Sequence, residues 1–214
     1  MDTQEDSAFS ARLELAIAIG LGLSAVLTAL CVYLTDVHDD EATIEFNAGV
    51  TATTQASGAY VEAAQRSAAD EALFVEYAQL ANAGALGDRL ALDGATYLQT
   101  GIMRDDLREA IEWWGKEAQR DPSLTTPFVP ENPFYVQPEL EEAQELTASA
   151  AESFKTAEDE QTLGDTFIIA DIIVAISLFL FGVAGVATAM RVKVGATVMG
   201  YVVFAVSLGI VAFG

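Results

Sequence analysis

Asp171 is the side chain that contrasts most with its surroundings, because it is the only charged residue in the apolar run 166–190. A carboxylate inside a bilayer costs about 2.5–3.5 kcal/mol at the centre and less near the surface. Such a group can contact an ion or a proton, or it can lie at the interface and reach water. Asp171 is one or two turns from the end of its run, so the interfacial position is the simpler interpretation.

The tightest group of acids in the chain is a second candidate site, formed by Asp36, Asp39, Asp40 and Glu41. Carboxylate oxygens are ligands for hard divalent cations, so this group predicts at most a weak cation site. A solvated acidic surface explains the same residues without a ligand. The sequence has no D-x-[DN]-x-[DN]-G loop, which excludes a calcium site of the EF-hand type.

The remaining reactive side chains indicate no catalytic site. Cys31 and His38 are the only cysteine and histidine, too few for a zinc site of His and Cys ligands. Trp113, Trp114 and Arg120 could stack on a ligand, but paired tryptophans are more often one core ring and one half-exposed ring. P-loop, GxSxG, HExxH and CxxC motifs are absent from the sequence. We therefore expect a protein that is not an enzyme, without catalytic, cofactor-binding or metal-ligating residues.

Three apolar runs have the length of membrane spans. Residues 15–34 and 194–213 are uncharged, and residues 166–190 contain only Asp171. About 20 apolar residues cross the roughly 30 Å hydrocarbon core at 1.5 Å per residue. The first run is longer than the apolar core of a cleaved signal peptide, so we expect it to be retained as an anchor. A multi-pass protein with the lipid bilayer as partner is predicted.

Basic residues beside the spans predict the orientation. Arg12 precedes the first span, and Arg191 and Lys193 lie in the turn between the second and third, whereas the opposite flanks contain only Lys155. The positive-inside rule favours the side with more Lys and Arg as the cytoplasmic one. The expected arrangement in the cell membrane is residues 1–14 and 191–193 in the cytoplasm, and residues 35–165 outside.

Residues 35–165 are expected to form a helical bundle, so the whole fold is predicted to be all-α. Ala, Leu, Glu and Gln are frequent, and all five prolines lie within 121–138, which therefore cannot be regular. Four helices are predicted: 39–83, 86–98, one starting at Asp105, and one starting at Pro138. The last should continue into the second span as a rod of about 50 residues, and the first span should likewise extend into the first of these helices.

Helical spacing of apolar residues predicts the core of the bundle. The predicted positions are Leu73, Phe74, Tyr77, Leu80 and Ala81 in the first helix; Leu86, Leu90 and Tyr97 in the second; Leu107, Ala110, Ile111, Trp114 and Ala118 in the third; and Leu140, Ala143, Thr147, Ala150, Phe154, Ala157 and Gln161 in the fourth. Phe128, Phe134 and Tyr135 of the proline segment are expected to cap the bundle or reach the membrane interface. A docking loop for another protein is the alternative.

Charge restricts the partners. The chain has 32 acids against 10 Lys and Arg, a net charge of −22, and residues 35–165 contain 27 of the acids and 7 of the basic residues. Nucleic acids and anionic lipids require a basic surface, so neither is an expected partner. Dense like charges repel unless salt screens them. This favours a salt-adapted source such as a halophilic archaeon, with a high-GC bacterium as the alternative.

Small residues recur four apart in all three spans, which lets helices approach closely in lipid. The pairs are Gly20–Ser24, Ser24–Thr28, Gly185–Ala189, Ala196–Gly200 and Ala205–Gly209. Most are expected to pack the three spans together. A homo-oligomer or a membrane partner protein is the alternative use of these faces.

Two segments resemble a family of uncharacterised three-span membrane proteins of bacteria and archaea. Residues 72–82, ALFVEYAQLAN, look like the aromatic helix that follows the first span in that family. Residues 157–193 look like its polar helix, which runs through a Gly-Asp step into an apolar span and then a basic turn. The resemblance implies a membrane location and no established activity.

Three functions are compatible with this pattern. The leading hypothesis is a non-enzymatic membrane protein whose external bundle scaffolds or senses, through self-association or a partner. The second is a sensory ectodomain, similar to those of chemoreceptors, that signals through a separate partner subunit. The third is an oligomeric ion-transport component that uses Asp171.

Overall fold

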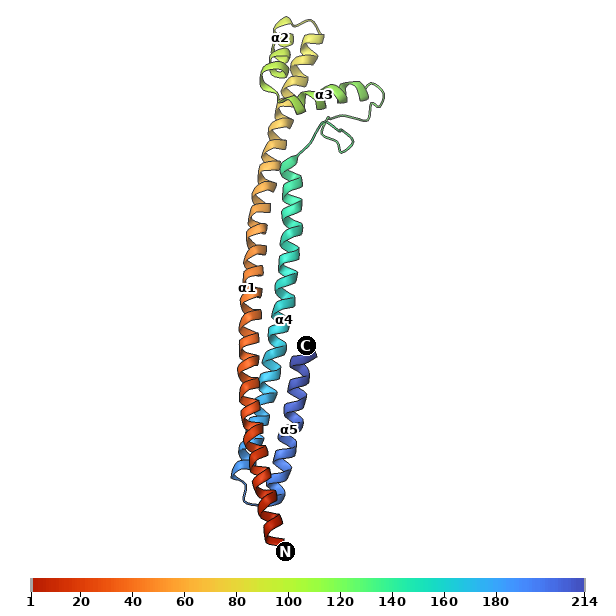
Figure 1. The fold of residues 1–214 in the computed structure, drawn as a ribbon. Coiled ribbons are helices and arrows are strands. Elements are labelled where there is room, and N and C mark those ends of the chain that lie inside the picture. Colours follow the sequence, from red (N-terminus) through yellow and green to blue (C-terminus); the bar gives the residue numbers. More distant parts are fainter. Residues whose placement is uncertain (1, 214) are drawn as a thin grey trace. The chain divides into compact units, whose positions relative to one another are not determined.

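The computed structural model describes residues 2–213, and this part of the chain contains helices and no strands (Figure 1). The helices are α1 (Asp2–Ala85), α2 (Arg89–Tyr97), the π-helix η1 (Leu98–Ile102), α3 (Asp105–Glu117), α4 (Pro138–Val186) and α5 (Met190–Phe213). The predicted all-α fold is confirmed. The helices α1, α4 and α5 each contain a stretch long and apolar enough to cross a membrane, which indicates a multi-pass membrane protein.

Two helices continue without a break from an apolar span into a polar segment, as the sequence predicts. Helix α1 has 84 residues, and α4 has 49. Helix α4 begins at Pro138, a favourable first residue because no helical partner is needed for its missing N–H. Glu139 and Glu141 follow in the first turn, where acids suit the helix dipole.

The chain divides into two compact units, which are described separately. The span unit comprises the residues up to 50 and from 151 onwards, and the central unit comprises residues 51–150. Helices α1 and α4 contribute to both units, whereas α5 belongs to the span unit and α2, η1 and α3 belong to the central unit.

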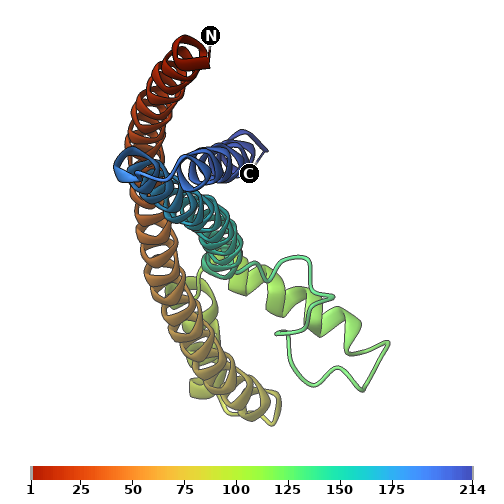
Figure 2. The ribbon, with the colours of Figure 1, turned by 90° about the horizontal axis from the view of Figure 1, so that it is seen from below.

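In the span unit, α1, α4 and α5 pack side by side (Figures 1 and 2). Within the span unit, the apolar part of α4 buries two residues in every seven. The polar part that precedes it buries one residue in every seven. The buried positions of the apolar part are Phe167, Ala170, Val174, Ser177, Phe181 and Ala184, and those of the polar part are Ala157 and Gly164. Helix α5 accounts for the difference because it covers a second face of α4, where Ser207 donates a 2.8 Å hydrogen bond to the Ala170 carbonyl.

Phe181 occupies a hole formed by glycines of the two neighbouring helices. A Cβ atom on Gly20 would lie 2.5 Å from the Phe181 ring, and one on Gly200 would lie 2.8 Å from it. The ring is fully buried and meets Tyr201 edge-on, with 4.9 Å between ring centroids. The Tyr201 hydroxyl donates a 2.7 Å hydrogen bond to the Ala16 carbonyl. Gly20 and Gly200 therefore pack the three spans against one another, as expected from the pairs Gly20–Ser24 and Ala196–Gly200, whereas a Cβ on Gly185 or Gly209 would meet nothing within 4 Å.

Serine hydroxyls link the same three helices. Ser24 of α1 and Ser177 of α4 share a 3.1 Å hydrogen bond, and the Ser177 hydroxyl also lies 3.1 Å from the Gly200 carbonyl of α5, to which it donates. All of these side chains are buried. Small polar side chains at helix contacts in lipid typically serve this purpose, since their hydrogen bonds have no competition from water.

The central unit has an aromatic and aliphatic core. Phe74, Leu98, Met103, Leu107 and Ile111 are its buried members. Partly buried residues pack against them, namely Leu73, Tyr77, Leu80, Trp114, Phe128 and Tyr135. The core predicted for the first and third helices is thereby confirmed. Phe128 and Tyr135 show that aromatic rings of the proline segment cover this core, whereas Phe134 stays exposed.

The prediction of which face of the second helix is buried is wrong. Leu86, Leu90 and Tyr97 are exposed, and α2 instead buries Ala91 and Ala95. Close approach to α1 explains the choice, since a Cβ on Gly84 would lie only 3.0 Å from the Leu92 backbone. Two helices can meet at this distance only through small residues. Leucine on that face of α2 would force the helices apart.

The helix also starts later than predicted, at Arg89 rather than at 86. Gly87 adopts a positive φ of 105°, which only glycine takes readily. The Asp88 carboxylate then accepts hydrogen bonds from the backbone N–H groups of Leu90 and Ala91, at 3.0 and 3.1 Å. This is an N-cap, and it fixes the first turn of α2.

The predicted stripe on α4 is narrower than expected. Ala143, Ala150 and Ala157, seven residues apart, are buried, whereas Thr147 and Gln161 are exposed. Within the central unit, Ala56, Ala59 and Ala63 of α1 are buried in the same manner. Small residues at a spacing of seven form a narrow seam between paired helices, as in a coiled coil.

Candidate functional site

Asp171 lies beside a small cavity of about 180 Å³ in the span unit. Thr35 and Asp36 of α1 line this cavity together with Asp171 of α4, and three aliphatic residues complete it: Val32, Ile168 and Ile172. Oδ1 of Asp171 is buried and has no hydrogen-bond partner within the described residues. The structure therefore brings Asp171 next to Asp36, one member of the predicted acidic group.

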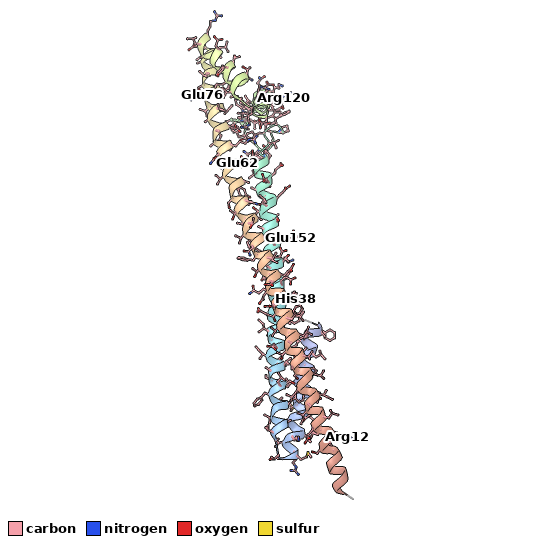
Figure 3. All side chains as sticks on the ribbon, turned by 60° about the vertical axis from the view of Figure 1, so that its left-hand side comes forward. Arg12, His38, Glu62, Glu76, Arg120 and Glu152 are labelled. Carbon is pink, nitrogen blue, oxygen red and sulfur yellow. The ribbon has the colours of Figure 1, made fainter. Side chains whose placement is uncertain are left out.

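His38 pairs with an acid of α4 in the same unit. Its Nδ1 lies 2.6 Å from Oε2 of Glu160, and its ring stacks on Phe167 with 5.4 Å between centroids. Next to this pair, α1 and α4 approach closely, since a Cβ on Gly164 would lie 2.9 Å from Oδ1 of Asp39. Figure 3 labels His38 on α1 and Arg12 near the other end of the packed spans. His38 therefore joins α1 and α4 through Glu160 and Phe167.

A broader groove of about 680 Å³ lies further along the same two helices. Phe46 and Phe154 line it with their rings 5.5 Å apart, and Asp39 and Glu158 add carboxylates. The Phe154 ring needs Gly49 on α1, because a Cβ there would lie 2.8 Å from the ring. The groove is thus a consequence of two large rings placed in a seam that is otherwise lined by small residues.

Two members of the predicted acidic group, Asp36 and Asp39, line different hollows of the span unit. Asp36 faces the cavity beside Asp171, whereas Asp39 lines the groove. Within the residues that the structure describes, no three His, Cys, Asp or Glu side chains are placed to hold a metal ion.

The tryptophan pair has separate roles in the central unit. Trp114 packs edge-on against Phe74, and its Nε1 donates a 2.9 Å hydrogen bond to the Leu124 carbonyl. Trp113 instead lines a cavity of about 120 Å³ with Phe134 and Lys116. Arg120, expected beside the pair, binds Glu117 at 2.6 Å. The structure does not assemble these three residues into a ligand site.

An ionic network that sequence patterns did not reveal joins α1, α3 and α4. Arg66 donates 2.6 Å hydrogen bonds to Asp106 and to Glu139. Arg104 donates to Asp70 at 2.9 Å and to Asp106 at 3.2 Å. Asp70 is the most buried member, with 1 % of its side chain exposed. The network holds two arginines and three carboxylates, and it fixes the start of α3 and α4 against α1.

The network lowers the pKa of Asp106 and of Glu139. Partial burial raises the pKa of Asp106, but hydrogen bonds from Arg104, the Leu107 N–H and Arg66 outweigh it and lower the pKa below the usual value. The pKa of Glu139 is lowered by a hydrogen bond from its own backbone N–H and by Arg66. Both carboxylates are therefore ionised at neutral pH, and their negative charges pair with the positive charges of the two arginines.

Asn132 anchors the proline segment. Its Nδ2 donates to the carbonyls of Ala110 at 3.1 Å and Pro127 at 2.8 Å, and its Oδ1 accepts from the Phe134 N–H. The side chain is buried. This irregular segment is thus held in place against α3, and Figure 2 shows the two lying together beside the start of α4.

The comparisons with known proteins give no further guidance, since no protein-family model, curated protein or solved structure matches the chain.

Proposed function

We propose that this protein is a non-enzymatic membrane protein that scaffolds or senses through residues 35–165, by association with itself or with a partner. The observation that carries the proposal is the continuity of α1 and α4. Each is one helix from its apolar span to the ionic network of the central unit. A state of residues 35–165 can therefore be coupled to the spans without a flexible linker.

We propose that residues 35–165 lie outside the cell membrane, with residues 1–14 and 191–193 in the cytoplasm. Lys193 lies 3.1 Å from Glu14, so the segment before the first span and the turn before α5 are at the same end of the span unit. Arg12 and Arg191 belong to these two segments. The clustering supports the assignment by the positive-inside rule.

Two variants that each add one cysteine test this topology. Glu62→Cys lies on an exposed position of α1, and Met190→Cys lies on an exposed position at the start of α5. A membrane-impermeant maleimide should label the first variant on intact cells and the second only after lysis. The wild-type chain is the control, because Cys31 is fully buried. Labelling of Met190→Cys on intact cells with Glu62→Cys protected would overturn the orientation.

The functional claim is tested by cross-linking in native membranes. A carbodiimide that couples the abundant carboxylates to amines should trap the protein in a dimer or in a complex with a partner. Mass spectrometry then identifies the trapped chain. A protein that stays monomeric and partner-free over a range of expression levels contradicts the proposal, whereas a ligand-dependent thermal shift would favour the sensory form of it.

A specific observation also supports the ion-transport alternative. Oδ1 of Asp171 is buried without a hydrogen-bond partner in the described residues and borders a cavity shared with Asp36. Three spans form no pore alone, so this function requires an oligomer. Asp171→Asn should abolish ion flux into proteoliposomes, and Asp165→Asn, at an exposed position of the same helix, is the matched control. Equal flux in both variants removes this alternative.

A further inference from the structure

The central unit exposes large apolar side chains beside α2. Leu86 is 86 % exposed, Leu90 is 83 % exposed and Tyr97 is 63 % exposed. With Arg89 and Asp93 they form what we call the α2 patch. Single exposed leucines are common on proteins, but neighbouring ones with this exposure usually mark an interaction surface.

The patch is held rigidly by the local fold. Leu90, Asp93 and Tyr97 are three and four residues apart, so they share one face of the helix. That face lies away from Ala91 and Ala95, which pack into the unit. The π-helix η1 then places Gly101 beneath the Tyr97 ring, where a Cβ would lie 3.3 Å from it. The ring is supported on one side and free on the other.

Charge distinguishes this surface from the rest of the acidic region. Residues 84–103 contain only Asp88, Arg89 and Asp93 as charged residues, in a region of 27 acids and 7 basic residues. Asp88 is engaged as the N-cap of α2. Arg89 and Asp93 form no ion pair with any residue that the structure describes, although most arginines of the central unit do.

We propose that the α2 patch binds a second copy of this chain about a two-fold axis. A two-fold contact places the same surface on both partners, so Arg89 of each copy can pair with Asp93 of the other while Leu86, Leu90 and Tyr97 become buried. Elsewhere two such acidic regions repel each other. This inference rests on the proposed function, and it names the partner and the surface through which association occurs.

The full-length protein in membranes provides the first test. Thr96→Cys introduces a thiol at an exposed position of α2, and Glu112→Cys introduces one at an exposed position of α3 outside the patch. Mild oxidation should join two copies of Thr96→Cys as a disulfide dimer and leave Glu112→Cys monomeric. An adduct of Thr96→Cys with a different protein, or no adduct, overturns the inference.

Charge exchange provides the stricter test. Arg89→Asp and Asp93→Arg, each in the Thr96→Cys background, should lower the dimer yield about tenfold when expressed alone, because like charges then face each other. Co-expression of the two single variants, or combination of both changes in one chain, should restore the dimer. If neither condition restores it while tryptophan fluorescence remains native, the two-fold pairing is wrong.

Apolar variants separate this inference from the proposed function. Leu90→Ser with Tyr97→Ser should abolish the Thr96→Cys dimer at low and at high salt, and Val61→Ser, another exposed apolar position, should not. If carbodiimide still traps dimers of the Leu90→Ser/Tyr97→Ser chain with an undiminished yield, the protein self-associates through another surface. In that case the α2 patch is excluded and the proposed function stands.

Discussion

The span unit and the central unit are held together by different interactions, although α1 and α4 belong to both. In the span unit, glycines accept the Phe181 ring, and serine hydroxyls bind to neighbouring helices. In the central unit, an aromatic core and an arginine network hold the helices together instead. The hydrophobic effect drives association in water but not between helices in lipid, where close packing and hydrogen bonds remain.

The comparison shows that one continuous helix can change its packing chemistry along its length. Both units keep buried residues seven apart on α4, as Ala143 and Ala150 do in one and Val174 and Phe181 in the other. The pairing of the helices therefore sets the spacing of the buried residues. The surroundings, water or lipid, set which side chains occupy these positions. The chain also carries a separate probe for each unit, because both tryptophans lie in the central unit and Cys31 is buried among the spans.

The largest effect is expected for Phe74→Ala in the central unit. Phe74 is buried and meets Trp114 and Phe128 edge-on, so its loss leaves a cavity at the centre of the core. Unfolding free energy should fall by about 3–5 kcal/mol. Urea titration followed by tryptophan fluorescence measures it. Val61→Ala, at an exposed position of α1, should change it by less than about 0.5 kcal/mol.

Arg66→Met should weaken the central unit by about 1.5–3 kcal/mol, because two carboxylates lose a charged hydrogen-bond donor. Methionine keeps much of the arginine stem, so the change reports mainly on the charge. The same urea titration applies, with Arg108→Met as control, since the partner of Arg108 is the exposed Asp105. If both variants lose the same unfolding free energy, burial of the network adds nothing to the stability of the central unit.

The network also predicts a pH dependence for the central unit. Asp106 and Glu139 have pKa values below their usual range in the folded state. The unfolded chain therefore binds protons first, and the stabilisation is fully present above about pH 4–5 and is lost as the pH falls further. The urea midpoint should decline below that range in the wild type and less steeply in Arg66→Met. A parallel decline in both would exclude the network as the cause.

Gly20→Leu tests packing in the span unit. Any side chain at Gly20 meets the buried Phe181 ring, whereas Gly22 has open space around its Cβ direction. Overpacking should lower the stability of the span unit by about 1–3 kcal/mol. Reaction of Cys31 with a membrane-permeant maleimide should then be roughly 5 to 150 times faster, since about 1.4 kcal/mol is a factor of ten. Gly22→Leu should leave the rate unchanged, and acceleration by both would refute the assigned hole.

The smallest effect is expected for Ser207→Ala, which removes one hydrogen bond to the Ala170 carbonyl. Such bonds in lipid contribute about 0.6 kcal/mol on average, which corresponds to a roughly threefold change in the Cys31 labelling rate. Val206→Ala, at an exposed position of the same helix, controls for loss of side-chain volume. A tenfold change would mean that hydrogen bonds, rather than the glycine holes, dominate the span unit.

The sequence alone determined the long helices α1, α4 and α5 and the helix α3. The lengths of the apolar runs, Pro138 at the start of α4 and the absence of a breaker between the polar and apolar parts of α1 and α4 are local properties, and each was sufficient to predict a helix. The core of α3 was also predictable, because its apolar residues repeat at the helical period over 13 residues. The position of Asp171 in an apolar run was equally evident.

The tertiary structure decided which faces and which partners meet. Periodicity groups Leu90 with Tyr97, but only the close approach of α1 to α2 selects Ala91 and Ala95 for burial. Arg66 finds its acids 40 and 73 residues away, a separation at which no local pattern operates. Likewise Gly20 and Gly22 are alike in sequence, and only the placement of Phe181 distinguishes them, because steric fit is a property of three packed helices rather than of one.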